Sequence, residues 1–321
     1  MQTEIPINNF YTVAFYNLEN LFDFREDPSV FDNSFLPNSE RNWTKKRYEQ
    51  KIFKLGQVIS QIGEASDEKI PTIIGLAEVE NKLVLHDLTQ SKHLRHHNYG
   101  FVHFDSKDER GVDVALLYDR DVFTVGHTQT YSVYLEKDLG VQDYTRDILL
   151  VTGILNKETV HFIVNHWPSR GEGMEISALK RLAAAKELKT IVDLLTAQDE
   201  TAKIVVMGDF NDNPTNESLQ YLSNQTALFN TMETLRSYSR GSLNHHSNWH
   251  LFDQILISTN FFETKANHLK FDKSDIFDPQ FLKQYKGRFK GRPFRTFVGT
   301  KYKGGFSDHF PVYLRLKSVT L

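Results

Sequence analysis

The sequence predicts an α/β protein in which a mixed sheet, or two packed sheets, carries helices on the outside. Several short runs are rich in β-branched and aromatic residues, which favour strands. Two longer stretches repeat their apolar residues every three or four positions, as surface helices do. These helices separate strands only early and midway along the chain, and strand follows strand elsewhere. That order favours mixed sheets over a purely alternating parallel fold.

The elements follow one another in a simple order. Predicted strands cover residues 11–17, 71–77, 100–104, 112–118, 148–155, 160–165, 203–208, 252–257 and 312–316. The first predicted helix covers residues 44–64, with an apolar stripe of Tyr48, Ile52, Leu55, Ile59 and Ile62. The second covers residues 174–197, with apolar positions Ile176, Leu179, Leu182, Leu188, Ile191 and Leu195. No linker rich in Pro, Gly or Ser divides the chain, so we expect one domain over residues 1–321.

Composition excludes several classes of function. The chain has 40% hydrophobic residues, a formal charge of -3 and no cysteine. Without cysteine there can be no thiol nucleophile, zinc-thiolate site, iron–sulfur cluster or disulfide. The near-neutral charge argues against a protein that coats nucleic acid non-specifically. A polyanion must therefore bind at a local site.

The sequence leaves the cellular compartment open. No apolar run approaches the roughly 18 residues that a membrane-spanning helix needs, so we expect no membrane span. Residues 1–10 lack the basic and apolar regions of a signal peptide. A soluble protein of this kind fits the cytoplasm, or the periplasm or exterior if a signal peptide has been removed. The sequence indicates no obligate protein partner.

Polar residues occupy the ends of several predicted strands. Asn17, Glu78, His166, Asp209 and Asp253 each lie within a strand-like run or at its carboxyl end, where side chains can converge on one edge of a sheet. Asn17 is either a turn former or part of a site. Glu78 follows a wholly apolar strand and either begins a solvated loop or binds a hard cation. Magnesium typically takes only one or two carboxylates, so one glutamate suffices.

The segment Gly208-Asp209-Phe210-Asn211 is the strongest single motif. Two residues apart, Asp209 and Asn211 point to the same side and offer a proton acceptor and a donor to one reacting group; a simple turn is the alternative. His166 and Arg170, four residues apart, suit the charged oxygens of a phosphate.

A buried acid near the carboxyl end requires a partner. Asp253 lies in an apolar strand, where a lone carboxylate is costly unless it is paired. The segment Ser307-Asp308-His309 offers that partner in His309. A carboxylate that fixes the tautomer and orientation of an imidazole is the usual way to make histidine a competent base.

Taken together and in this order, these segments resemble the endonuclease/exonuclease/phosphatase family, which includes pancreatic deoxyribonuclease, abasic-site endonucleases, sphingomyelinases and inositol polyphosphate 5-phosphatases. The resemblance extends from Tyr16-Asn17 to Ser307-Asp308-His309, which is nearly the whole chain. It implies a four-layer α/β sandwich with two packed mixed β-sheets flanked by helices. It also implies a phosphodiester hydrolase that depends on Mg²⁺ or Mn²⁺ and acts by in-line attack of water on phosphorus.

The resemblance also implies roles for the metal-binding and phosphate-binding residues. Glu78 corresponds to the principal metal ligand, Asn17 sits beside it, and Asp308 lies close to the metal. Tyr144-Thr145-Arg146-Asp147 resembles the segment from which deoxyribonuclease supplies a phosphate-contacting arginine, which implies that Arg146 contacts phosphate.

For the catalytic residues, the resemblance implies that Asp209 and Asn211 orient or deprotonate the attacking water. His309, paired with Asp253, corresponds to the catalytic histidine. His166 is similar to the second histidine of deoxyribonuclease-like members, and Asp113 in Gly111-Val112-Asp113 corresponds loosely to the carboxylate that orients it. Whether Asp209 or His309 takes the proton of the water stays open.

Details of the motifs favour a nuclease. The GDFN form is that of deoxyribonuclease, and the residues around Asp209 and Asp253 differ from those of 5-phosphatases and abasic-site enzymes. A phospholipid or sphingomyelin phosphodiesterase, or a phosphomonoesterase, is the alternative within the family. A lipid enzyme needs an exposed apolar hairpin, which the sequence does not indicate. An inactive binding module would be expected to lack a catalytic residue, and none is missing.

A basic and aromatic stretch precedes the Ser307-Asp308-His309 segment. Between residues 283 and 303 there are eight basic residues and no acid, with five aromatic residues interleaved: Tyr285, Phe289, Phe294, Phe297 and Tyr302. Cations and stacking platforms suit a flexible single-stranded polyanion. The alternative is a solvated loop with structural aromatics.

Overall fold

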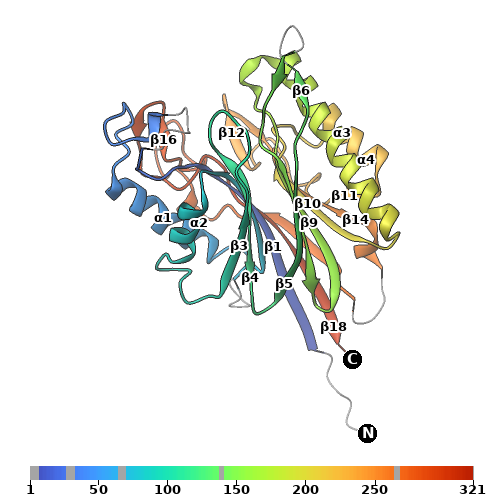
Figure 1. Cartoon of the computed structure of the whole chain (residues 1–321). Coiled ribbons are helices and arrows are strands. Elements are labelled where there is room, and N and C mark those ends of the chain that lie inside the picture. Colours follow the sequence, from blue (N-terminus) through green and yellow to red (C-terminus); the bar gives the residue numbers. More distant parts are fainter. Residues whose placement is uncertain (1–6, 27–32, 64–69, 137–140, 264–267, 321) are drawn as a thin grey trace.

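The computed structural model describes residues 7–26, 33–63, 70–136, 141–263 and 268–320, which form two six-stranded sheets packed face to face (Figure 1). The first sheet has the order β15 (Lys270–Ile276), β18 (Val312–Thr320), β1 (Ile7–Leu21), β2 (Ile73–Val79), β4 (Asp113–Asp119) and β3 (Tyr99–His103). The second has the order β11 (Leu228–Asn230), β14 (Asp253–Ser258), β10 (Lys203–Asp209), β9 (Glu158–His166), β8 (Ile148–Leu155) and β5 (Phe123–Tyr131).

Helices form the two outer layers. On one side lie α1 (Lys45–Ile59) and α2 (Lys82–Thr89), and on the other lie α3 (Met174–Gln198) and α4 (Glu217–Gln225) (Figure 1). The predicted four-layer sandwich is therefore confirmed. Short hairpins decorate it: β6 (Leu135–Glu136) with β7 (Gln142–Asp143), β12 (Leu243–His245) with β13 (Asn248–His250), and β16 (Phe297–Val298) with β17 (Lys301–Tyr302). Within the described residues, no helix is long and apolar enough to cross a membrane.

The long helices occur where neighbouring strands are parallel. Strand β1 runs parallel to β2, and β9 runs parallel to β10, whereas the other pairs of the large sheets are antiparallel. A parallel pair needs a crossover connection, and α1 and α3 supply it. Antiparallel pairs can be joined directly, which explains the order read from the sequence.

Alternating side chains on β10 divide the apolar interior into two layers. Val205 and Met207 belong to the cluster between the sheets, together with residues of β1 and β2. Ile204 and Val206 face the other way and pack with Leu188 on α3. Because both faces of β10 are covered, the strand is apolar between Lys203 and Asp209, as a central strand should be.

The predicted helices need correction at their ends. Helix α1 ends at Ile59, whereas the prediction extended to residue 64, which lies outside the described residues. In α3 the predicted apolar stripe is wrong in its first turns, where Ile176 and Leu179 are 55% and 70% exposed. Small or long-stemmed side chains such as Ser177 and Arg181 are buried there instead. The regular stripe toward the sheet includes Leu188.

Candidate active site

Polar side chains from both sheets meet at one edge of the sandwich. Asn17 lies in β1 and Glu78 in β2, while His166 and Asp209 end β9 and β10 and Asp253 begins β14. The register pairs Asp209 with His166 on one side and with Asp253 on the other. The predicted convergence of strand ends therefore holds for all five residues. The two sheets contribute to one site.

Asp209 links the two sheets at this edge. The Asn17 amide nitrogen donates to Asp209 Oδ2 at 3.0 Å, and the backbone N–H of Asn211 donates to Oδ1 at 2.9 Å. Gly208 is required just before it, because a Cβ there would lie 2.4 Å from the carbonyl oxygen of Asn165. These contacts fix the Asp209 carboxylate at the junction of β1, β9 and β10.

The pairing of His309 with Asp253 is present. Asp253 Oδ2 lies 2.7 Å from His309 Nδ1, and the carboxylate is fully buried. Ser307, which sequence reasoning did not single out, holds the loop in place. Its hydroxyl donates to the carbonyl oxygen of Asn17 at 2.7 Å and accepts from the backbone N–H of His309 at 3.1 Å. Imidazole Nε2 is left facing the other acids.

Carboxylate and imidazole atoms follow one another around this edge at nearly constant spacing. His166 Nε2 lies 4.0 Å from Glu78 Oε1 and 3.8 Å from Asp209 Oδ2. His309 Nε2 lies 3.9 Å from Asp209 Oδ2 and 4.0 Å from Asp308 Oδ1. These distances are too long for hydrogen bonds, but each suits a third atom bonded to both groups. An atom bound at this edge could therefore contact two neighbouring groups at once.

The two histidines have opposite charge states at neutral pH. Burial alone would lower the pKa of His309, but the Asp253, Asp209 and Asp308 carboxylates outweigh it and hold that pKa well above its usual range. Burial, with the nearby Arg146 and Arg110 guanidinium groups, holds the pKa of His166 well below its usual range. Burial and the Asp253 charge raise the pKa of Asp209 to about 6. An imidazolium and a neutral imidazole therefore flank an ionised Asp209.

Glu78 is held in a strained backbone conformation. Its φ is 62°, and the pairing of β2 with both neighbours shifts register between Ala77 and Val79. This bulge takes Glu78 out of the ladder, a common device beside active sites. Oε2 accepts from the backbone N–H of Asn20 at 2.7 Å, and Oε1 lies 3.7 Å from a guanidinium nitrogen of Arg110. Oε1 is directed to the shared edge.

Asp308 is positioned by a network that the sequence did not reveal. Arg295 donates to Asp308 Oδ2 at 2.8 Å and lies 3.5 Å from Glu19 Oε1. Glu19 accepts from the backbone N–H of Thr296 at 2.5 Å and lies 4.0 Å from the buried Lys51 ammonium. Burial and the Asp308 charge raise the pKa of Glu19 to about 6. The sequence signal that could have identified Glu19 is its position two residues after Asn17, because residues two apart in a strand share a face.

Replacement of Glu19 with Ala is expected to destabilise the fold strongly. The change leaves the Lys51 ammonium buried without its carboxylate and frees two backbone N–H groups, so we expect a loss of about 3–5 kcal/mol in the free energy of unfolding. Urea denaturation measures this loss. The matched double variant Glu19→Ala/Lys51→Met should recover part of it, since no charge is then left unpaired. A loss below about 1 kcal/mol for Glu19→Ala would contradict the role assigned to the network.

The two predicted phosphate-binding arginines are both engaged with protein atoms. Arg146 is buried, lies 3.0 Å from Asp108 and donates to the carbonyl oxygen of Trp167 at 3.1 Å. Arg170 donates to the carbonyl oxygen of Asn211 and to Asp212, both at 2.9 Å. The structure therefore places Arg170 as a support of the loop that follows Asp209. The Asn211 amide also donates to Trp167 at 3.0 Å.

The predicted contact between Asp113 and His166 is wrong. Asp113 accepts from the backbone N–H of Ser106 at 3.2 Å, and His166 Nδ1 is buried without a hydrogen-bond partner among the described residues. Asp113 begins β4 opposite Val79, and within the described part of the chain its carboxylate is engaged by the loop before β4 and not by β9.

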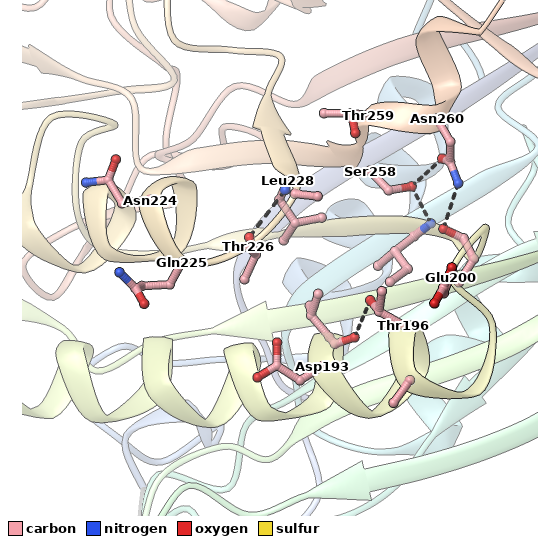
Figure 2. Close-up of a pocket in the computed structure, with 15 residues that line it drawn as sticks. Asp193, Thr196, Glu200, Asn224, Gln225, Thr226, Leu228, Ser258, Thr259 and Asn260 are labelled. Atoms are coloured by element: carbon pink, nitrogen blue, oxygen red, sulfur yellow. Dashed lines mark hydrogen bonds between the residues drawn. The ribbon is translucent and has the colours of Figure 1, made fainter.

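Two pockets differ in their relation to this edge. A pocket of about 170 Å³ adjoins it and is lined by residues that include Arg110, Thr145, Arg146 and Ser169. A pocket of about 680 Å³ lies between the carboxyl end of α3, the end of α4 and the segment after β14 (Figure 2). Ser258 donates to the Asn260 side chain, Asn260 donates to the carbonyl oxygen of Thr201, and the pocket contains none of the predicted site residues.

Comparison with known families agrees with this geometry. A sequence model of the endonuclease/exonuclease/phosphatase family matches residues 12–318. The chain belongs to this family. Its members are phosphoester hydrolases and are generally dependent on divalent metals. Comparison with curated protein sequences gives no significant match.

Solved structures share the fold at low sequence identity. A family protein from Bacteroides thetaiotaomicron superposes with a TM-score of 0.61 at 16% identity, over 98% of this chain and 97% of the other. A mannosyl-6-phosphatase from the same organism has a TM-score of 0.59 at 16% identity, over 95% and 99%. A D. rerio TDP2 in complex with a single-stranded DNA product has a TM-score of 0.58 at 11% identity, over 96% and 98%. At these identities the similarity shows the fold alone.

The donor atoms at the edge suit a divalent cation. Glu78, Asn17 and Asp308 offer oxygen ligands, the type that Mg²⁺ and Mn²⁺ prefer. Glu78 Oε1 lies 3.7 Å from its nearest cationic group, and the Asp308 side chain is 31% exposed. Glu78 Oε1 and the Asp308 carboxylate are therefore both open to an ion. Asp209, Asp253 and His309 also bring ligand atoms within 4.8 Å of one another. The residues present therefore fit the metal that the family implies.

Proposed function

We propose that this protein hydrolyses phosphodiester bonds of nucleic acid with Mg²⁺ or Mn²⁺ as cofactor, as one catalytic domain whose sheets share a core. The main support for this function is the series of carboxylate and imidazole atoms from Glu78 to Asp308, in which neighbouring groups lie 3.8–4.0 Å apart. Such a border accommodates the oxygen atoms of a phosphate and a water molecule. A binding site without chemistry would not need the Asp209 carboxylate held between a cationic His309 and a neutral His166.

Each side chain has a role in this proposal. Glu78, with Asn17 and Asp308, would hold the metal ion, which when bound supplies positive charge to the phosphate oxygens. Asp209 orients the attacking water and accepts its proton. Its two oxygens are already fixed by Asn17 and Asn211, so its remaining lone pairs have a defined direction.

The histidines stabilise the negative charge that develops on the phosphate. His309, held by Asp253, presents a cationic N–H group to one oxygen. His166 presents Nε2 from the other side, 3.8 Å from Asp209. Water attacks phosphorus as the bond to the leaving oxygen breaks; Asp209 accepts a proton from the water, and the Nε2–H group of His309 can give one to the leaving oxygen, so no covalent intermediate with the protein is needed. The pocket beside Arg110 and Arg146 offers room for a further group of the substrate.

A panel of substrates tests this proposal. Plasmid DNA, RNA, bis-p-nitrophenyl phosphate, p-nitrophenyl phosphate and sphingomyelin are assayed with Mg²⁺ or Mn²⁺, and with chelator as the control. We expect metal-dependent hydrolysis of nucleic acid and of the small diester. Hydrolysis of the monoester alone would replace the proposal with a phosphatase, and hydrolysis of sphingomyelin alone with a lipid phosphodiesterase.

The basic and aromatic stretch supports a long substrate, but only in part. Phe294, Phe297 and Tyr302 pack against the core, as the loop interpretation expected. Tyr285 and Phe289 are exposed, among cations that stand clear of the core. The hairpins β12–β13 and β16–β17 lie at the end of the sheets opposite both termini (Figure 1). The stretch also contacts the site through Arg295 and Asp308. A strand of nucleic acid can therefore extend from the metal site over residues 285–292.

Neutralising the cations of residues 286–292 is expected to affect only long substrates. In the variant Lys286→Gln/Arg288→Gln/Lys290→Gln/Arg292→Gln, KM for long DNA or RNA should rise, because each engaged cation contributes about one phosphate contact to the salt dependence of binding. Hydrolysis of bis-p-nitrophenyl phosphate should barely change. Steady-state kinetics at two salt concentrations measure both effects.

A variant with four other exposed cations neutralised serves as the matched control: Lys92, Arg95, Lys157 and Lys186. It carries the same change of net charge and should leave the KM for nucleic acid close to that of the wild type. Equal effects of the two variants would contradict a role of residues 285–292 in substrate binding. Equal losses on long and small substrates would instead indicate that the segment supports Asp308.

A further inference from the structure

A second group of potential metal ligands lies at the end of the first sheet. His103 ends β3 and Asp113 begins β4, and the register pairs His103 with Ala115. Asp113 and Ala115 are two residues apart and therefore share a face of the sheet, which is also the face of His103. Asp105 follows His103 in the loop, and its Oδ1 lies 3.8 Å from His103 Nδ1. Ligand atoms of all three lie within 4.8 Å of one another.

The state of His103 is unusual for a structural histidine. The side chain is fully buried, yet neither Nδ1 nor Nε2 has a hydrogen-bond partner among the described residues. A buried polar group left unbonded is costly, so native structures nearly always satisfy it. Burial lowers the pKa of His103 to about 4, and the neutral imidazole therefore has a lone pair to give at physiological pH. An electron-pair acceptor other than these side chains, such as a metal ion, would bind this lone pair of His103.

We propose that His103, Asp105 and Asp113 bind a divalent transition-metal ion of the zinc or manganese type, at a site separate from the catalytic edge. One imidazole nitrogen and two carboxylate oxygens are a common ligand set for such ions, and Mg²⁺ disfavours the nitrogen. Tetrahedral ligands at about 2.1 Å lie roughly 3.4 Å apart. The present spacing thus requires only a modest closure. Asp105 can provide it, because its side chain is 79% exposed.

The ion would fix a loop that reaches the catalytic edge. Asp105 and Asp113 stand at the two ends of the segment between β3 and β4. Within it, Asp108 pairs with Arg146 at 3.0 Å, and Arg110 donates to the side chain of Asn20 at 2.7 Å. An ion bound to both ends closes this loop into a ring and reduces its freedom to move. The assignment rests on His103 and not on the catalytic role of Glu78.

The number of zinc ions bound per chain tests the site. Wild type and Asp105→Asn are equilibrated with Zn²⁺, and bound metal is measured by elemental analysis and by calorimetric titration. We expect one fewer equivalent in Asp105→Asn, or an affinity at that site weakened at least tenfold. Because Asp105 is exposed, this variant should fold normally. Zn²⁺ bound at the catalytic edge is common to both proteins and cancels in the comparison.

Further variants separate the alternatives. His103→Gln should give the same loss as Asp105→Asn, while the control His86→Ala, which removes an exposed histidine 3.6 Å from Asp87, should not. Glu78→Gln should still bind the Zn²⁺ equivalent assigned to His103. The zinc site can therefore be confirmed even if the proposed catalysis is not found. Zn²⁺ should raise the Tm of the wild type by more than that of Asp105→Asn, because Zn²⁺ at the catalytic edge stabilises both proteins equally. Unchanged stoichiometry, affinity and Tm response in both His103→Gln and Asp105→Asn would overturn the assignment.

Discussion

Glu78→Gln is expected to lower kcat/KM by about three orders of magnitude, which corresponds to about 4 kcal/mol of lost transition-state stabilisation. Glutamine has the size of glutamate and retains an oxygen that can accept from the backbone N–H of Asn20. The strained turn at φ 62° should therefore persist, and the loss should come from the missing charge at Oε1. Steady-state kinetics across a magnesium titration measure it, and circular dichroism checks the fold.

The neighbouring Glu80 provides a matched control for this change. Glu80 Oε2 accepts from the backbone N–H of Asp23 at 2.6 Å, a bond of the same kind as that made by Glu78. Glu80→Gln removes an equal charge two residues away, so it should leave kcat/KM within a few fold of the wild type. If Glu78→Gln instead retained nearly the wild-type rate at every magnesium concentration, the assignment of Glu78 as metal ligand would have to be abandoned.

Sequence reasoning succeeds where one residue constrains its own surroundings. Asp253 lies in an apolar strand and had to find a partner, and His309 is that partner at 2.7 Å. The long helices could be placed because their apolar stripes face a sheet over several turns. In each case burial limits the choice of residue, and the pattern is visible in a single chain.

The residues that sequence reasoning missed depend on contacts between distant segments. Glu19 is defined by Lys51 and Thr296, which lie far along the chain, and its own neighbours give little indication of them. The resemblance implied that Asp113 orients His166, but the Asp113 carboxylate accepts from the backbone N–H of Ser106 in the loop before β4 instead. Strand β15 was not predicted, since as an edge strand it carries charged residues that hide its period. The sequence of one strand does not show which residues of other segments lie close to it in the fold.

The second large effect is expected from the pair of His309 and Asp253. His309→Ala and Asp253→Ala should each lower kcat/KM by about 10²–10⁴-fold. The double variant should lose little more than the worse single variant, because each residue acts only through the other. His268→Ala is the control, since that imidazole also lies close to a carboxylate, 2.9 Å from Glu158, but at an exposed position. A double loss equal to the product of the single losses would show that the residues act independently.

The charge of the pair can be tested separately from its shape. Asp253→Asn keeps the size of the side chain but removes the buried negative charge that raises the pKa of His309. That pKa should therefore fall, since the Asp209 and Asp308 carboxylates alone must then oppose burial. NMR titration of the imidazole follows the shift directly. If the cationic form of His309 stabilises the phosphate, activity of Asp253→Asn should decline as pH rises through the lowered pKa, in a range where the wild-type His309 is still protonated. A pH profile identical to that of the wild type would mean that Asp253 orients the imidazole without setting its charge.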